Sequence, residues 1–126
     1  MFQIGFSQKS NTIKNYIETF QDEKTKNLLI DLALELGLIK RDKKNPKTFY
    51  DTFRDRIMFP IWDQFGSIQG FTSRSINNFQ KPKYLNSPAS LVFDKKNLLY
   101  PLHLAKNSIR SNGHIIICEG NMDAIA

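Results

Sequence analysis

Residues 114–123 run His-Ile-Ile-Ile-Cys-Glu-Gly-Asn-Met-Asp, and this order indicates a strand that ends at a chemically active edge. Four consecutive apolar residues, Ile115 to Cys118, are typical of a buried parallel strand. Open α/β sheets keep their functional groups at the carboxyl ends of strands, where Glu119 falls. Asp123 follows four residues later, in the expected first turn of a helix, so the two carboxylates can face one metal ion or phosphate.

The composition bounds the class of protein. A chain of 126 residues is long enough for one domain or pieces of two. Its apolar stretches are far shorter than the ~20 residues of a membrane-spanning helix, and no secretory signal opens the chain. We therefore expect a cytoplasmic protein without a membrane partner. The single cysteine, Cys118, excludes an internal disulfide and a Cys-rich zinc site, and we expect it to be buried in its strand.

The net charge of +6 is concentrated in the middle of the chain. Residues 40–96 hold twelve basic and five acidic residues, an excess of seven positive charges, so the rest of the chain sums to −1. Seven of the ten phenylalanines lie in the same segment. Basic residues interleaved with aromatics favour a groove for single-stranded nucleic acid. A phenylalanine core beneath a solvated basic loop explains the same composition, and both interpretations stay open.

Periodicity predicts helices first and strands later. The expected helices are Thr12 to Phe20 and Asp22 to Leu36, the second with Leu29, Leu32, Ala33 and Leu36 on one face. Residues 40–47 are expected to form a loop. Strands are predicted to begin at Arg56, where apolar residues start to alternate, and residues 67–75 are expected to complete a hairpin.

The last third of the chain is predicted to be less regular. Residues 77–90 are rich in Asn, Pro and Ser and predict an ordered loop. Residues 98–107 fit a short helix that begins near Pro101. The Ser-Asn-Gly break at residues 111–113 is the expected domain boundary, ahead of the strand at residues 115–118.

Several strings in this sequence resemble the DnaG-type bacterial DNA primases. They occur in the order and spacing of that family: Tyr50-Asp51-Thr52-Phe53-Arg54-Asp55-Arg56-Ile57-Met58-Phe59-Pro60-Ile61, Gly70-Phe71, Arg74, Pro82-Lys83-Tyr84-Leu85-Asn86-Ser87-Pro88, Leu99-Tyr100 and Glu119-Gly120-Asn121-Met122-Asp123. The string at residues 82–88 is the most specific, because a strand followed by Glu-Gly also marks other Toprim proteins. Asn121 departs from the family, which commonly has an aromatic residue there.

The resemblance implies an α+β fold. Residues 1–112 would be the N-terminal subdomain of the primase catalytic core, and residues 113–126 the truncated start of an α/β Toprim domain. The family's zinc-binding domain, its later Asp-x-Asp strand and its helicase-binding domain have no counterpart in these 126 residues. The chain therefore resembles a fragment, for which we expect no zinc, an incomplete metal site and no activity of its own.

The resemblance also implies the roles of particular residues. Glu119 would be a catalytic carboxylate that binds Mg²⁺ or Mn²⁺, with Asp123 as a second catalytic carboxylate. The residues expected to contact template DNA or nucleotide phosphates are Arg54, Arg56, Arg74, Lys83, Tyr84, Asn86 and Lys95. The implied partners are single-stranded DNA, ribonucleoside triphosphates and, for the full-length protein, a replicative helicase. Phosphoryl transfer needs metal-binding carboxylates and phosphate-binding cations of this kind.

Each assignment has a structural alternative. Arg54 and Arg56 can instead pair with Asp51 and Asp55, and Tyr84 can pack beneath its loop rather than stack on a base. Lys96 can replace Lys95. For the whole chain, the alternatives are a non-catalytic single-stranded DNA-binding module, a phage or plasmid primase-helicase relative, or a Toprim nuclease.

Overall fold

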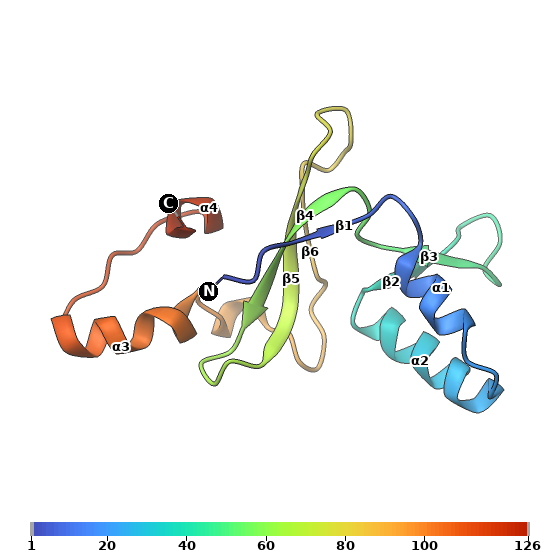
Figure 1. The fold of residues 1–126 in the computed structure, drawn as a ribbon, viewed down its shortest axis with the longest axis horizontal. Coiled ribbons are helices and arrows are strands. Elements are labelled where there is room, and N and C mark those ends of the chain that lie inside the picture. Colours follow the sequence, from blue (N-terminus) through green and yellow to red (C-terminus); the bar gives the residue numbers. More distant parts are fainter. Residues whose placement is uncertain (1, 126) are drawn as a thin grey trace.

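The computed structural model describes residues 2–125 and has mixed helix and sheet (Figure 1), as the α+β prediction requires. In chain order the elements are β1 Gly5–Ser7, α1 Thr12–Glu18, α2 Glu23–Glu35, β2 Ile39–Arg41, β3 Phe49–Asp51, β4 Arg56–Trp62, β5 Ile68–Ser75, β6 Tyr84–Asn86, a 3₁₀ turn at Lys95–Asn97, α3 Leu102–Asn112 and α4 Asn121–Ile125. In these described residues, no helix is long and apolar enough to cross a membrane.

A four-stranded antiparallel sheet forms the centre of the molecule, in the order β1-β4-β5-β6. The hairpin predicted from the alternating pattern is β4 and β5. Its turn is held by the Asp63 carboxylate, which accepts hydrogen bonds from the backbone N–H groups of Phe65 (2.8 Å) and Ser67 (2.9 Å). Side chains on these strands alternate between the two faces of the sheet.

The two predicted helices pack together on a separate two-stranded ribbon, β2 and β3, beside the central sheet (Figure 1). A core of Ile17, Ala33, Ile39 and Phe49 joins them. Helix α2 turns the predicted Leu29 and Ala33 toward this core, whereas Leu32 is largely exposed. This unit therefore has its own apolar centre.

Asp51 fixes the start of α1. Its buried carboxylate accepts hydrogen bonds from the backbone N–H groups of Ile13 (2.8 Å) and Lys14 (2.9 Å), while its own N–H donates to Asn11 Oδ1 (3.0 Å). The first N–H groups of a helix lack partners within the helix, and a carboxylate satisfies them well. The Asp51 carboxylate therefore has a structural role at the start of α1.

The Asn86-Ser87-Pro88 string ties the helical unit to the sheet. Ser87 is buried, and its Oγ accepts a hydrogen bond from the Phe71 N–H (2.9 Å). Pro88 lies so close to Gly37 that a Cβ at residue 37 would overlap the proline Cδ. Gly37 also has φ +68°, so both the space and the backbone there require glycine.

The structure has strands both before and after the two that the sequence predicted. The prediction of a first strand at Arg56 is wrong, because β1, β2 and β3 precede it. The expected loop at residues 77–90 contains β6, paired with β5. Each of these four strands has three residues, too few to show an alternating pattern.

Helix α3 begins next to Pro101, as predicted, but runs five residues beyond the expected end at residue 107, to Asn112. Gly113 ends it with φ +69°, in the left-handed conformation common after helices. An aromatic stack attaches the helix to the sheet: the Trp62 ring lies 6.5 Å from the Tyr100 ring and 4.4 Å from that of His103.

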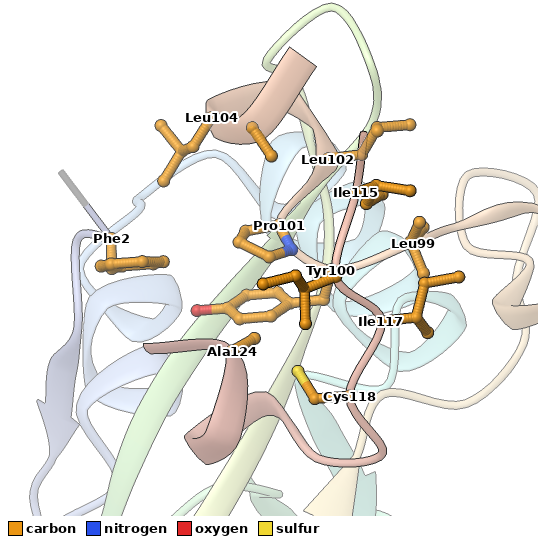
Figure 2. Close-up of a pocket in the computed structure, with 12 residues that line it drawn as sticks. Phe2, Leu99, Tyr100, Pro101, Leu102, Leu104, Ile115, Ile117, Cys118 and Ala124 are labelled. Carbon is orange, nitrogen blue, oxygen red and sulfur yellow. The ribbon is translucent and has the colours of Figure 1, made fainter. Parts of the chain in front are cut away.

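The strand predicted at residues 115–118 is absent from the described part of the chain, where these residues have no regular structure. Cys118, expected to be buried, is exposed. A strand needs a hydrogen-bonded neighbour, and the described strands all pair elsewhere. Instead, the segment and α3 line an apolar pocket of about 300 Å³ (Figure 2).

Candidate functional site

One face of the central sheet gathers polar and cationic side chains. Two cross-strand rows run over β4, β5 and β6 on this face: Phe59–Thr72–Asn86 and Ile57–Arg74–Tyr84. Residues two apart on a strand share a face, so Arg74 and Thr72 point the same way, as do Tyr84 and Asn86. The short strand β6 thus aligns two predicted binding residues with a third on β5.

The predicted carboxylates lie across a hollow from this face. The hollow has a volume of about 490 Å³, and we call it the groove. Its lining residues are Phe59, Thr72, Arg74, Tyr84, Asn86, Glu119, Gly120, Asn121, Met122 and Asp123. The structure therefore brings together five of the predicted site residues from two distant parts of the chain.

Lys95 lines a neighbouring hollow of about 200 Å³ that shares Thr72, Asn86 and Asn121 with the groove. It projects from the 3₁₀ turn, which is capped by the Asp94 carboxylate accepting a hydrogen bond from the Lys96 N–H (3.0 Å). Lys96 does not line either hollow. Of the two candidates the structure places Lys95 beside the groove.

Tyr84 lies between two cations at the rim of the groove. The Arg74 guanidinium carbon is 5.8 Å from the centre of its ring, and the Lys83 ammonium is 5.9 Å from it. The side chain is 53% exposed, so it does not pack beneath its loop. An aromatic face flanked by cations can stack on a base while the cations bind phosphates.

Arg56 lies apart from these residues. It is 2% exposed, and its guanidinium donates hydrogen bonds to the carbonyls of Pro82 (2.8 Å) and Lys83 (3.5 Å). Burial lowers the pKa of this guanidinium. Arg56 pairs with Ser75 in the sheet, one position out of phase with Arg74, and so faces the other side. Its predicted contact with nucleic acid stays a prediction.

Arg54 also lies outside the groove. Its guanidinium carbon is 4.9 Å from the centre of the Tyr50 ring, and it lines another hollow of about 360 Å³ with Lys9, Asp55 and Asn77. Asp51, suggested as an alternative partner, is occupied by α1. The role of Arg54 in binding stays a prediction.

Local structure in the last residues of the chain positions the carboxylates of Glu119 and Asp123. Helix α4 places Asp123 in its first turn, as expected. A Cβ at Gly120 would be 2.8 Å from Asp123 Oδ2, so the glycine leaves room for the carboxylate to fold back toward residue 120. Both Glu119 and Asp123 line the groove.

Two carboxylates fit part of a magnesium site. Mg²⁺ in nucleotide enzymes is commonly held by one or two carboxylates together with substrate phosphates and water. Among residues 2–125 there is no cluster of three or more His, Cys, Asp or Glu side chains that could hold a metal ion alone. Glu119 and Asp123 are therefore residues that could share a metal ion with a bound nucleotide.

Sequence reasoning missed Thr72 and Phe59 in the groove lining. Thr72 precedes Arg74 by two residues in a predicted strand, so alternation could have placed it on the same face. It also missed Asp51 as the cap of α1, because its partners lie 37 and 38 residues away and no local pattern links them.

The antiparallel sheet has a helical unit at one end and a carboxylate-bearing segment at the other, and solved primase catalytic cores have a similar fold. The fold is similar to that of the Escherichia coli primase catalytic core, with a TM-score of 0.76 and 32% identity over 98% of this chain and 37% of that one. It is also similar to a DnaG primase catalytic domain bound to single-stranded DNA, with a TM-score of 0.68 and 30% identity over 85% of this chain and 32% of that one.

Residues 1–106 match the family described as DNA primase catalytic core, N-terminal domain, and the chain belongs to that family. The DNA primase of Staphylococcus aureus (strain COL) is 42% identical to it over 122 residues, which are 97% of this chain. The chain spans about a fifth (19%) of the length of that relative.

Proposed function

We propose that this chain is the template- and nucleotide-binding part of a DNA primase, which synthesises short RNA primers on single-stranded DNA from ribonucleoside triphosphates. The observation that carries the proposal is the groove. It sets Arg74, Tyr84 and Asn86 on a rigid sheet opposite Glu119 and Asp123. Cations for phosphates, an aromatic for bases and carboxylates for metal are the parts that nucleotidyl transfer requires.

The reaction joins a 3′ hydroxyl to the α-phosphorus of a nucleoside triphosphate and releases pyrophosphate. Lys95 binds the polyphosphate and holds its charge as the leaving group forms, while Arg74 binds a phosphate of the template strand. Tyr84 offers its exposed face to a base, and the Asn86 amide can donate or accept a hydrogen bond beside it. A divalent cation held by Glu119 and Asp123 would supply charge neutralisation for the transferred phosphoryl group.

The partners follow from the same proposal. Single-stranded DNA is the template, as the DNA-bound relative suggests. A replicative helicase would join the full-length protein through a region outside this chain. Among the described residues, only two carboxylates, Glu119 and Asp123, line the groove. We therefore expect the isolated chain to bind template without making primers.

Binding of a fluorescent oligo(dT) to the 126-residue chain, followed by anisotropy, tests the proposal. We expect Arg74→Ala to weaken binding about fivefold to tenfold and to reduce the slope of log affinity against log salt by about one, since it removes one phosphate contact. Lys24→Ala on exposed α2 is the matched control, because it removes the same charge far from the groove in sequence and fold. A salt-independent affinity, or equal effects of both variants, would contradict the proposal.

A non-catalytic DNA-binding module is the second candidate, favoured by the basic face of the sheet alone. The two candidates differ at the carboxylates. If they hold a metal ion with the nucleotide, Mg²⁺ should strengthen binding of a ribonucleoside triphosphate, and Glu119→Gln with Asp123→Asn should abolish that enhancement. A binding module predicts the same nucleotide affinity with and without Mg²⁺ and with and without these substitutions.

A further inference from the structure

The loop between β5 and β6 projects beyond the sheet at the end opposite the β4–β5 turn (Figure 1). Its residues 77–83 carry Phe79, whose side chain is 92% exposed. Burying a phenylalanine stabilises a fold, and isolated exposed apolar residues are nevertheless common. The exposure of Phe79 therefore needs further observations before it indicates a binding site.

The first such observation is that the loop is held in place. Asn77 accepts a hydrogen bond from the Phe79 N–H on its side-chain oxygen (2.9 Å) and another from the Gln80 N–H on its carbonyl (3.2 Å). The Gln80 amide donates to the Arg54 carbonyl (2.9 Å), and buried Arg56 donates to the Pro82 carbonyl (2.8 Å). Phe79 is thus presented outward from a loop that is anchored on both sides, so little ordering is required when it binds.

The second observation is the charge around it. No aspartate or glutamate lies between Asp63 and Asp94, while Arg74, Lys81 and Lys83 fall in that interval. The segment formed by β5, the loop and β6 therefore contributes cations and no acidic residue, and the neighbouring carboxylate is Asp55, which lines a hollow with Asn77 and Gln80. Such a surface attracts a polyanion, and the aromatic residue at its end suits unpaired bases.

The third observation is position. Tyr84, at the rim of the groove, follows the loop directly, and Lys83 contacts its ring. Tyr84 is five positions after Phe79, so the chain limits the distance between their Cα atoms to about 18 Å. A single strand that leaves the groove past Tyr84 is therefore next to Lys83 and within reach of the loop that carries Lys81 and Phe79.

From these observations we infer that Phe79 stacks on an unpaired base of the template strand outside the groove, while Lys81 and Lys83 contact the flanking phosphates. The inference rests on the proposed function, since it assumes that single-stranded DNA occupies the groove. It extends the binding surface by one stacking position, supplied by the β5–β6 loop. Duplex DNA would not provide this contact, because its bases are already stacked.

Phe65 offers a matched control. It is also highly exposed, at 82%, but it lies in the β4–β5 turn, at the other end of the hairpin and next to Asp63. Alanine at either position removes the same side chain from a solvent-exposed site, so the folded structure should be equally unaffected. A difference in binding between the two variants then reports on position.

The experiment compares two 15-nucleotide probes, oligo(dT) and an abasic strand with the same phosphates. We expect Phe79→Ala to weaken oligo(dT) binding about fivefold to tenfold and to leave abasic-strand binding within twofold, and Phe65→Ala to change neither. We also expect oligo(dT) to quench the emission of Phe79→Trp but not that of Phe65→Trp, over a background from buried Trp62 that both share.

The outcomes separate this inference from the proposed function. If the unsubstituted chain binds oligo(dT) and Phe79→Ala binds it equally well, the stacking position is wrong and the proposed function stands. Equal weakening on oligo(dT) and the abasic strand also overturns stacking, because it assigns Phe79 to the shape of the loop. If the unsubstituted chain binds neither probe, both the proposed function and the stacking inference fail.

Discussion

The two walls of the groove are held in place by different means. In the sheet wall, Arg74 lies on β5, which is hydrogen-bonded to strands on both sides. Tyr84 lies on β6, which pairs with β5 beside buried Ser73. The other wall, residues 114–125, has Ile116 87% exposed and Ile117 74% exposed. The comparison shows that the sheet wall is fixed by strand pairing, whereas residues 115–118 of the carboxylate wall line an apolar pocket together with α3.

Hydrogen exchange should show the largest difference between the two walls. Amides of Thr72 and Arg74 in β5 lie between β4 and β6, so we expect them to exchange only through global unfolding, which costs about 5–15 kcal/mol in a domain of ordinary stability. The amides of Ile116 and Ile117 lie outside regular structure and should exchange at least about 1,000-fold faster. Exchange followed by NMR or mass spectrometry would contradict the comparison if protection were similar in both walls.

Removing the guanidinium of Arg56 should produce the next largest effect, on stability. Arg56→Met keeps most of the buried side chain but removes the donor to the Pro82 carbonyl and the longer hydrogen bond to the Lys83 carbonyl, which still accepts one from the Ser75 N–H (2.8 Å). We expect the free energy of unfolding to fall by about 2–3 kcal/mol, measured by urea denaturation with an unchanged m-value.

Arg54→Met is the control for this loss, because Arg54 contacts the Tyr50 ring and should cost less than about 1 kcal/mol. Equal losses in both variants would mean that the buried hydrogen bonds do not support the sheet wall. A binding defect in Arg56→Met without any loss of stability would instead favour the nucleic-acid contact predicted from the sequence.

The two walls also differ in how well the sequence predicted them. Alternation predicted β4 and β5, and the resemblance selected Arg74 on β5, which lines the groove; its binding role stays a prediction. The three-residue strands could not be found, because their pairing is set by distant partners and not by a local period. Likewise, the burial of Arg56 depends on the register between β4 and β5, which no single strand reveals.

The carboxylate wall shows the opposite balance. The sequence predicted that Glu119 and Asp123 lie together, and both line the groove, but the local structure of residues 115–118 was not predicted and the catalytic role of the two carboxylates stays a prediction. Four apolar residues indicate a buried strand only if another strand lies beside them, and residues 115–118 have none among the described strands. The local sequence therefore identified Glu119 and Asp123. It could not show whether residues 115–118 have a neighbouring strand to pair with.

The smallest effect is expected where α3 is attached to the sheet, at the contact between His103 and Trp62. Burial lowers the pKa of His103, and the nearby positive charge of Lys106 adds to this, while Asp63 opposes it. The folded state therefore disfavours the charged imidazole, and His103 Nδ1 is buried with no hydrogen-bond partner among the described residues. The stability associated with neutral His103 is present above pH 6.5 and is lost as the pH falls below 6.5 toward the lowered pKa.

Urea denaturation at a series of pH values measures this loss. The fluorescence of Trp62, the one tryptophan, reports on the contact with His103. We expect the midpoint of the unsubstituted chain to decrease from pH 7.5 to pH 5.5 and that of His103→Gln to decrease less. The exposed His114 is the second histidine and supplies the control, His114→Gln, which should follow the unsubstituted chain. If His103→Gln keeps the full pH dependence, the imidazole does not control how α3 is attached to the sheet, and the attachment then rests on the contact of Tyr100 with Trp62.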